Sequence, residues 1–329
     1  MQDMTYLETG STDPYYNLAF EETVLRERRE GDYLILWQND NTIVIGQKQN
    51  TAAEVNASFV EAHHVNVVRR ATGGGAVYHD LGNLNYSFIT DEDSSAASER
   101  FTQPIVRALR SLGLEAEASG RNDILANGRK VSGTAQRHLN GRVLHHGTLL
   151  FDSDMEVLSQ ALQVRPEKYR SKGVASVRAR VANIRSLLPQ DMTLPDFWQY
   201  LREHLSERPL QTDTLTEQEL REVAVLRESK YATWEWNYGR SLAFERFTCR
   251  KWDGGFLEIS LNLDAGRISD IRLQGDFLSL LPVAPVEEAL RSCPFSRAAM
   301  AEKLAVFDLT QYFGTITAEE ILDTVFDAE

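Results

Sequence analysis

Three consecutive glycines, preceded by two arginines, form the strongest chemical signal in the sequence. Residues 69–80 read Arg-Arg-Ala-Thr-Gly-Gly-Gly-Ala-Val-Tyr-His-Asp, and they follow a stretch, 65–68, that is typical of a β-strand. Glycines allow the backbone to turn sharply beside a ligand, and successive N–H groups can form a nest for phosphate oxygens. The segment therefore predicts a phosphate site, although three glycines alone more often form only a hairpin connection. It is not a Walker loop, because no Gly-Lys-Ser or Gly-Lys-Thr follows.

A carboxylate and an ammonium group are brought together by a second segment, 121–135. The Asn-Gly pair at 127–128 predicts a tight turn, so Asp123 and Lys130 are expected on paired strands. A carboxylate near a phosphate site usually indicates Mg²⁺, and a lysine there acts as a point charge on phosphoryl or acyl oxygens. The alternative is an exposed hairpin with solvated charges.

Other reactive side chains give weaker signals. His145 and His146 are adjacent on an expected strand, where neighbours face opposite sides of the sheet, so they make a poor metal pair. Packing or hydrogen bonding is the default role for either ring. The cysteines, Cys249 and Cys293, lie far from the glycine run, so thiol catalysis has no candidate there.

The charge distribution is uneven. The 329 residues include 35 Lys and Arg against 48 Asp and Glu, a formal net charge of −13, which disfavours non-specific nucleic-acid binding. Between residues 121 and 185, however, 12 basic side chains stand against 5 acidic ones, so this segment carries +7 and the remainder −20. The basic segment indicates either a bound anion or a few solvated arginines, and charge alone does not decide between them.

Composition narrows the class of protein. No apolar run approaches the roughly 20 residues of a membrane helix, the first ten residues lack the pattern of a secretory signal, and two distant cysteines make no disulfide framework. We therefore expect a cytoplasmic protein with neither a membrane nor a nucleic-acid partner. We also expect a monomer, an expectation that does not follow from the composition.

The elements that must position these groups are helices mixed with strands. The patterns predict strands at 34–37 and 42–45 around a turn, then at 65–68, 84–89, 130–139 and 143–151, and a hairpin of 256–263 with 267–274. Helices are predicted at 15–30, 52–63, 99–112, 154–162, 195–205, 217–229, 286–291, 297–307 and 318–326, and an ordered loop at 165–183. The fold class is α+β, with a large domain at 1–245 and a small α+β domain at 246–329.

Taken in order, these segments resemble the lipoate–protein ligase A family. The resemblance rests on six segments, at 69–83, 119–123, 129–135, 145–150, 172–178 and 234–239. It implies the mixed-sheet fold of biotin and lipoate protein ligases, with a C-terminal accessory domain. It also implies ATP-dependent activation of lipoate to lipoyl-AMP, and transfer of the lipoyl group to a lysine of an acceptor protein. The acceptors implied are the lipoyl domains of 2-oxoacid dehydrogenase complexes and the H protein of glycine cleavage.

The resemblance also assigns roles to residues. Lys130 is the implied catalytic residue, touching the α-phosphate and the acyl oxygen, and Asp123, with Asn122, is the implied Mg²⁺ ligand. Residues 75–78 would cradle the nucleotide. The implied binding residues are Arg70, Gly73, Gly74, Gly75, Ala76, Val77, Tyr78, Asn83, Asn122, Asp123, Lys130, Gly133, Ala135, Arg137, His146, Lys172, Arg178 and Arg180.

Two other functions remain as alternatives. An acyltransferase that takes octanoyl groups from acyl carrier protein shares this fold, and some such enzymes use a cysteine nucleophile. Both cysteines here follow residue 245, which argues against that type. A non-catalytic lipoate- or adenylate-binding protein is the other alternative, and the presence of both Lys130 and Asp123 argues against it.

Overall fold

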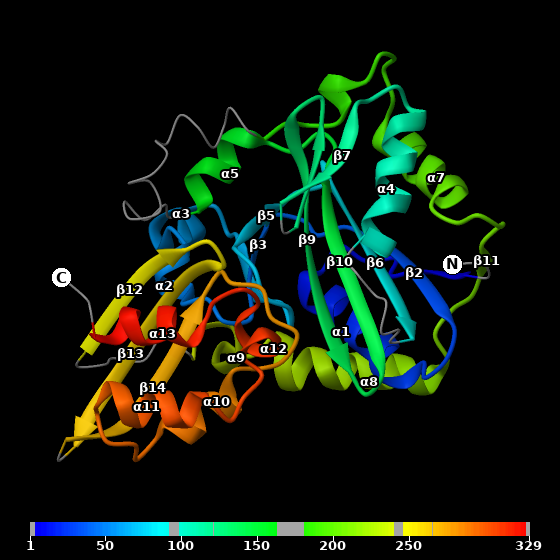
Figure 1. Ribbon diagram of the computed structural model, residues 1–329. Helices are drawn as coiled ribbons and strands as arrows, with labels where there is room; N and C mark the ends of the chain where they lie inside the picture. The colour runs from blue at the N-terminus through cyan, green and yellow to red at the C-terminus, as the bar shows by residue number, and fades with distance from the viewer. Residues whose placement is uncertain are drawn as a thin grey trace.

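The structure is a computed structural model that describes residues 4–91, 99–120, 122–162, 181–239, 246–264 and 266–326 (Figure 1). The strands are β1 (Met4–Glu8), β2 (Asp32–Trp37), β3 (Thr42–Ile45), β4 (Asn66–Arg69), β5 (Val77–His79), β6 (Asn83–Asp91), β7 (Ala116–Ser119), β8 (Asp123–Ala126), β9 (Arg129–Leu139), β10 (Arg142–Leu150), β11 (Gln211–Thr212), β12 (Arg246–Trp252), β13 (Gly255–Asp264) and β14 (Arg267–Gly275). The helices are α1 (Pro14–Glu27), α2 (Thr51–Glu54), α3 (Ala57–Ala62), α4 (Glu99–Ser111), α5 (Met155–Ala161), α7 (Leu194–His204), α8 (Glu217–Leu226), α9 (Trp234–Tyr238), α10 (Ala284–Leu290), α11 (Arg297–Leu304), α12 (Leu309–Phe313) and α13 (Ala318–Phe326), with a 3₁₀ turn η2 (Arg185–Leu187) and a π-helical turn η3 (Arg227–Tyr231). The α+β class expected from the sequence is confirmed.

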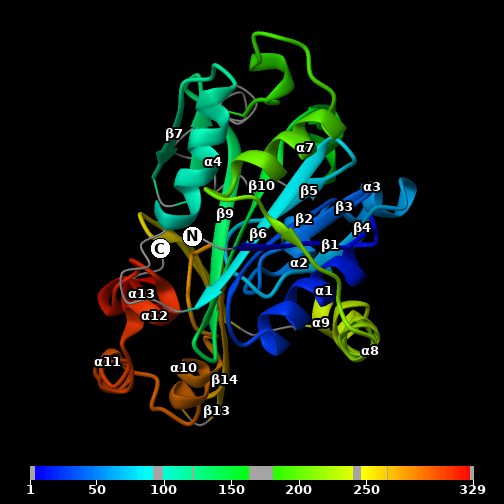
Figure 2. The same ribbon diagram turned by 90° about the vertical axis from the view of Figure 1, so that its right-hand side faces the viewer.

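An eight-stranded mixed sheet, in the order β11-β1-β2-β6-β10-β9-β8-β7, forms the centre of the large domain. Helices α4 and α7 cover one face and pack on Tyr86 and Phe88 of β6. Helices α1 and α8 lie on the other side, where Leu18 and Val24 pack against Ile35 of β2 (Figure 2). Because both faces are covered, apolar side chains point to both sides of the inner strands.

Strands β2 and β3 do not form the hairpin that their spacing suggests. Both segments are strands, as predicted, but β2 pairs with β1 and β6, whereas β3 pairs with β4 and β5 in a separate three-stranded sheet. The glycine run joins β4 to β5, so this small sheet holds both of its ends.

Local signals locate most other elements. The Asn-Gly pairs at 127–128 and 140–141 adopt positive φ angles at both residues, as the predicted hairpin turns require. The expected helix at 52–63 is two helices, α2 and α3, because Asn56 is extended and its side chain accepts the Phe59 N–H as the cap of α3. Strands β1, β7, β11 and β12 were not predicted. The expected loop at 165–183 lies largely outside the described residues.

The C-terminal region has a core of its own. Strands β12, β13 and β14 form an antiparallel sheet, and α10, α11 and α13 pack against it around Leu273, Val286 and Met300. The predicted boundary at residue 245 falls in a part of the chain that the structure does not describe, so its position stays a prediction. Lys48 of the large domain joins the two regions, because its ammonium group donates to Tyr312 O at 2.9 Å and to the Ser279 hydroxyl.

Within the described ranges, no helix is both long enough and apolar enough to cross a bilayer. The cytoplasmic location stays a prediction.

Candidate active site

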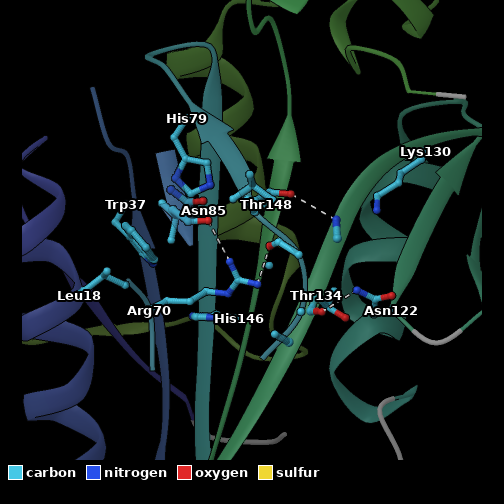
Figure 3. A pocket seen from close by; sticks show the side chains of 18 residues that line it. Leu18, Trp37, Arg70, His79, Asn85, Asn122, Lys130, Thr134, His146 and Thr148 are labelled. Atoms are coloured by element: carbon cyan, nitrogen blue, oxygen red, sulfur yellow. Dashed lines mark hydrogen bonds between the residues drawn. The ribbon is translucent and has the colours of Figure 1, made fainter. Parts of the chain in front are cut away.

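A pocket opens beside the glycine run, on the face of the central sheet that carries α1 (Figure 3). The space between its walls is about 660 Å³, a figure that includes open solvent at the mouth. Leu18, Trp37 and Val44 make one end apolar, and Lys130 and Asn122 stand at the other end. The lining is Leu18, Trp37, Val44, Arg70, Gly74, Gly75, Ala76, Val77, His79, Asn85, Asn122, Lys130, Gly133, Thr134, Ala135, His146, Gly147 and Thr148.

Lys130 and Asp123 form the ion pair expected from the β8–β9 hairpin. The lysine Nζ lies 2.6 Å from Asp123 Oδ1, and both side chains remain 35% exposed. The lysine side chain runs across Gly133, where a Cβ atom would stand 3.5 Å from Nζ. The ammonium group therefore reaches the pocket mouth while staying accessible to a ligand.

Arg70 stabilises the turn of the glycine run through hydrogen bonds to its backbone. Its guanidinium donates to Gly73 O at 2.6 Å, to Gly75 O at 2.8 Å and to Val44 O at 3.1 Å. Burial lowers the pKa of Arg70 to about 10, while Glu21 acts in the opposite direction. Gly74 has a φ of +89°, which favours glycine. Arg70 thus lines the pocket, but its N–H groups already donate to backbone carbonyls, so they are not free for an incoming phosphate.

Arg69 has the same kind of role one position earlier. The side chain is fully buried, and it donates to Gly46 O, to Gln49 O and to Asn237 O at 2.9, 2.6 and 3.0 Å. These bonds tie β4 both to the segment before α2 and to α9. The aromatic segment at 234–239 therefore braces the glycine run from behind.

His146 links the sheet to the glycine run and to α1. Its Nδ1 lies 2.8 Å from Glu21 Oε1, and its Nε2 lies 2.7 Å from Thr72 Oγ1. Ser87 donates to the same Glu21 oxygen at 2.5 Å. His145 points to the other face, as predicted, and stacks on Phe101 at a centroid distance of 4.9 Å.

Arg137 lies behind the pocket wall, beside Glu22. Its guanidinium is 3.4 Å from Glu22 Oε2, and Lys230 of η3 donates to that oxygen at 2.5 Å, as does the Tyr231 hydroxyl. Burial alone would raise the pKa of Glu22, but Lys230 and Arg137 hold it at about 2. Arg137 therefore belongs to a buried charge cluster and does not line the pocket.

The structure brings most, but not all, of the sequence-predicted residues to the pocket. Those that line it are Arg70, Gly74, Gly75, Ala76, Val77, Asn122, Lys130, Gly133, Ala135 and His146. Asp123 reaches it only through Lys130. Four predicted residues that the structure describes lie elsewhere: Gly73, Tyr78, Asn83 and Arg137. Gly73 lies against Phe277 of the C-terminal region, and Arg137 pairs with Glu22. The Tyr78 hydroxyl donates to Asn41, and the Asn83 amide donates to Asn85. Lys172, Arg178 and Arg180 lie outside the described residues.

Comparisons with known proteins match both regions of the chain. Residues 13–206 match the family described as lipoyl protein ligase A/B catalytic domain, and residues 241–325 match the bacterial lipoate protein ligase C-terminus. A lipoate–protein ligase of Bacillus subtilis is 41% identical over 95% of this chain and 97% of its own length. The chain belongs to the lipoate–protein ligase family. The resemblance stated from the sequence is confirmed.

Solved structures of lipoate–protein ligases match about three quarters of this chain. Lipoate–protein ligase A bound with ATP has a TM-score of 0.63 at 31% identity, covering 73% of this chain and 99% of that one. A bipartite lipoate protein ligase from Thermoplasma acidophilum, studied with its E2 lipoyl domain, has a TM-score of 0.65 at 32% identity, covering 74% of this chain and 98% of that one. The fold expected from the resemblance is therefore confirmed.

Eight residues that line the pocket of this ligase were missed from the sequence. They are Leu18, Trp37, Val44, His79, Asn85, Thr134, Gly147 and Thr148. The two-residue period of a strand carried a usable signal for Thr148, because it faces the same side as His146. No comparable signal existed for Leu18, Trp37 and Asn85, because the packing of α1 and the order β2-β6-β10 in the sheet bring them to the pocket.

Asp123, paired with Lys130 at the pocket, is the carboxylate that the sequence analysis assigned to a metal ion. No group of three His, Cys, Asp or Glu side chains that could hold an ion occurs in those ranges. Magnesium is often bound by one or two carboxylates together with substrate phosphates. One carboxylate beside Asn122 therefore fits Mg²⁺ only in company with a bound nucleotide.

Proposed function

We propose that this ligase activates lipoate and transfers it at one site, the pocket between the glycine run and Lys130. The observation that carries the proposal is an apolar pocket end joined to an accessible ammonium group. The apolar side chains Leu18, Trp37 and Val44 suit an aliphatic tail, and Lys130 stands where the carboxyl end of that tail would emerge. ATP-dependent ligation of lipoate is the activity of the family to which the chain belongs.

In the first half-reaction, a lipoate carboxylate oxygen attacks the α-phosphorus of ATP. A P–O bond forms, the bond to the β-phosphate breaks, and pyrophosphate leaves. The negative charge on the phosphoryl oxygens increases in the transition state, and Lys130 is placed to stabilise it. The backbone of residues 75–78 would bind the nucleotide. Mg²⁺, held by Asp123 together with phosphate oxygens, would neutralise phosphate charge when bound.

In the second half-reaction, an acceptor lysine amine attacks the acyl carbonyl of lipoyl-AMP. A C–N bond forms, the bond from the acyl carbon to the AMP oxygen breaks so that AMP leaves, and the amine gives up a proton to solvent. Lys130 would again stabilise the oxygen that gains charge. We propose, as acceptors, the lipoyl domains of 2-oxoacid dehydrogenase complexes and the H protein of glycine cleavage. The E2 lipoyl domain studied with the T. acidophilum ligase supports this class of partner.

The test is a mass assay on a purified apo lipoyl domain, with lipoate, Mg²⁺ and ATP each omitted in turn. We expect a gain of one lipoyl group that requires all three and is lost in Lys130→Ala. Modification from octanoyl acyl carrier protein without ATP would instead make the protein a transferase. Lipoate binding without any modification would make it a binding protein.

The transferase alternative has no support from the cysteines of this chain. Cys249 lies on β12 and Cys293 follows α10, and neither lines the pocket. A cysteine nucleophile is therefore not available in the described part of the site.

A further inference from the structure

Two buried side chains on the pocket wall, His79 and Asn85, carry N–H groups to which neither half-reaction gives a role. His79 is 3% exposed and Asn85 2% exposed, and both line the pocket (Figure 3). Neither His79 Nε2 nor Asn85 Nδ2 has a hydrogen-bond partner among the described residues. A buried donor without an acceptor is costly, so these two groups indicate a ligand oxygen.

A relay of two asparagines fixes which nitrogen of His79 carries the proton. Asn17 Nδ2 donates to two backbone carbonyls, Gln38 O at 2.6 Å and Ser11 O at 3.1 Å, which identifies this atom as the amide nitrogen. Asn39 Oδ1 lies 3.0 Å from the same nitrogen and shares one of its two hydrogens, so Asn39 presents its own nitrogen to His79 Nδ1 at 3.1 Å. His79 Nδ1 must therefore accept, and the proton lies on Nε2.

Asn85 is hydrogen-bonded to Asn83, two residues earlier on β6. Asn83 Nδ2 donates to Asn85 Oδ1 at 3.0 Å, which occupies the carbonyl end of the Asn85 amide. The Asn85 amide nitrogen is left without a partner among the described residues. Both side chains line the same pocket, His79 from β5 and Asn85 from β6.

The imidazole is a neutral donor at physiological pH. Burial lowers the pKa of His79 to about 3, and Arg70 and His146, the charged or titratable groups acting on the ring, lower it further. A neutral donor can stabilise a developing negative charge without carrying a proton of its own into the reaction.

The position of Asn85 in the sheet indicates which oxygen is bound. In register across the sheet, Asn85 lies opposite Trp37 on one side and Thr148 on the other, and Thr148 accepts the Gly133 N–H beside Lys130. Asn85 therefore stands between the apolar end and the ammonium end of the pocket. An aliphatic acid that fills the apolar end would place its carboxylate at this boundary, ahead of the phosphates.

We propose that His79 Nε2–H and Asn85 Nδ2–H bind one oxygen of the lipoate carboxylate and hold it through both half-reactions. This inference rests on the proposed function and deepens it. While one carboxylate oxygen attacks phosphorus, the other accepts from His79 and Asn85. In the transfer step the same oxygen becomes the acyl carbonyl oxygen, and it takes the negative charge when the acceptor amine adds.

The test compares lipoate with lipoinol, in which a CH₂OH group replaces the carboxylate. Calorimetric affinities are measured for both ligands and for ATP on the full-length protein and on Asn85→Leu and His79→Phe, which keep side-chain size. We expect each variant to bind lipoate roughly ten- to a hundredfold more weakly, as loss of a hydrogen bond to a charged group implies. Lipoinol affinity should change much less, and ATP affinity should be unchanged.

The matched control is His145→Phe, a buried histidine on the opposite face of the sheet that does not line the pocket. It should bind lipoate as the wild type does. An equal loss of lipoate and lipoinol in the two pocket variants would mean that His79 and Asn85 only pack the wall, and would overturn the proposal. A selective loss of ATP would overturn it as well, because the donors would then bind the nucleotide.

A second variant, Asn39→Asp, tests the proton on Nε2 without removing the ring. An acidic oxygen facing Nδ1 draws the proton to that atom and raises the pKa of His79. Nε2 then carries a proton only when the ring is charged. We expect lipoate affinity in this variant to rise as pH falls between about pH 9 and pH 6, where the wild type stays flat. A flat profile in Asn39→Asp would overturn the relay.

Failure of the function and failure of the inference give different results. If the wild type binds lipoate but never modifies an acceptor, the ligase proposal fails and the affinity pattern still tests the oxygen subsite. If the wild type modifies the acceptor and both pocket variants match its lipoate affinity, only the subsite fails.

Discussion

The charged residues around the pocket fall into two groups that differ in burial. At the mouth, Lys130 and Asp123 are each about one-third exposed and are paired with one another. Behind the glycine run, Arg69 and Arg70 are buried and bonded to backbone carbonyls. The first group can exchange its partner for a substrate at low cost, whereas the second cannot give up its carbonyls without leaving buried acceptors unpaired. The charged residues of the two predicted segments therefore differ in role, because those at the mouth can react whereas those behind the glycine run stabilise the fold.

Loss of the mouth lysine should have the largest effect on activity and almost none on folding. We expect Lys130→Ala to lower the ligation rate by roughly two to three orders of magnitude, by analogy with other preorganised charge-stabilising groups. The free energy of unfolding should change by less than about 1 kcal/mol, because exposed ion pairs contribute little. Single-turnover kinetics and urea denaturation on the same preparations check both. A large loss of stability would remove the distinction between the two groups.

Loss of a frame arginine should give the opposite pattern. Arg69→Leu leaves Gly46 O, Gln49 O and Asn237 O without the donor that now serves them. We expect the free energy of unfolding to fall by about 3 kcal/mol or more. The exposed Arg29, changed to leucine as a control, should stay within about 0.5 kcal/mol of the wild type. If Arg69→Leu is as stable as this control in urea denaturation, the bracing role assigned to it is wrong.

The pH dependence of the free energy of unfolding tests the buried charge cluster around Glu22. Its carboxyl has a folded-state pKa of about 2, below the ordinary value of 4.5, so its contribution is complete above the unfolded value and is lost as pH falls toward 2. We expect Glu22→Gln to be less stable than the wild type at pH 7 by about 3 kcal/mol, with the difference shrinking steadily below about pH 4.5. Urea unfolding over this pH range measures it. A difference that persists unchanged at low pH would mean that packing, and not charge, is what the variant loses.

The smallest effect is expected for a buried polar group that serves neither role. His145 has no hydrogen-bond partner among the described residues and stacks on Phe101. His145→Phe should leave the ligation rate unchanged, and it should raise the free energy of unfolding by about 1 kcal/mol, because a buried unpaired polar group is removed. Thermal denaturation and the mass assay test this. Loss of activity in this variant would show that the far face of the sheet reaches the site.

Local sequence patterns predicted much of the fold, because the backbone preferences of individual residues determine the turns. The Asn-Gly turns at 127–128 and 140–141 set the β8–β9–β10 hairpins because both residues of each turn tolerate positive φ. That geometry placed Asp123 and Lys130 together, as expected. The separation of β2 from β3 could not be predicted in this way, because strand partners are chosen by packing between distant elements.

The active site also combines features that the sequence predicts with features that only tertiary packing determines. The sequence by itself determined which residues could do chemistry: the glycine run, the lysine and carboxylate of one hairpin, and the histidine pair on one strand. Only the tertiary structure decided that Arg70 donates to backbone carbonyls and that Arg137 pairs with Glu22. It also decided that His79 and Asn85 line the pocket. The physical reason is that a hydrogen-bond donor has no fixed role until its partner is placed. For His79 that partner is Asn39, which lies 40 residues away and is itself oriented by Asn17 on another element.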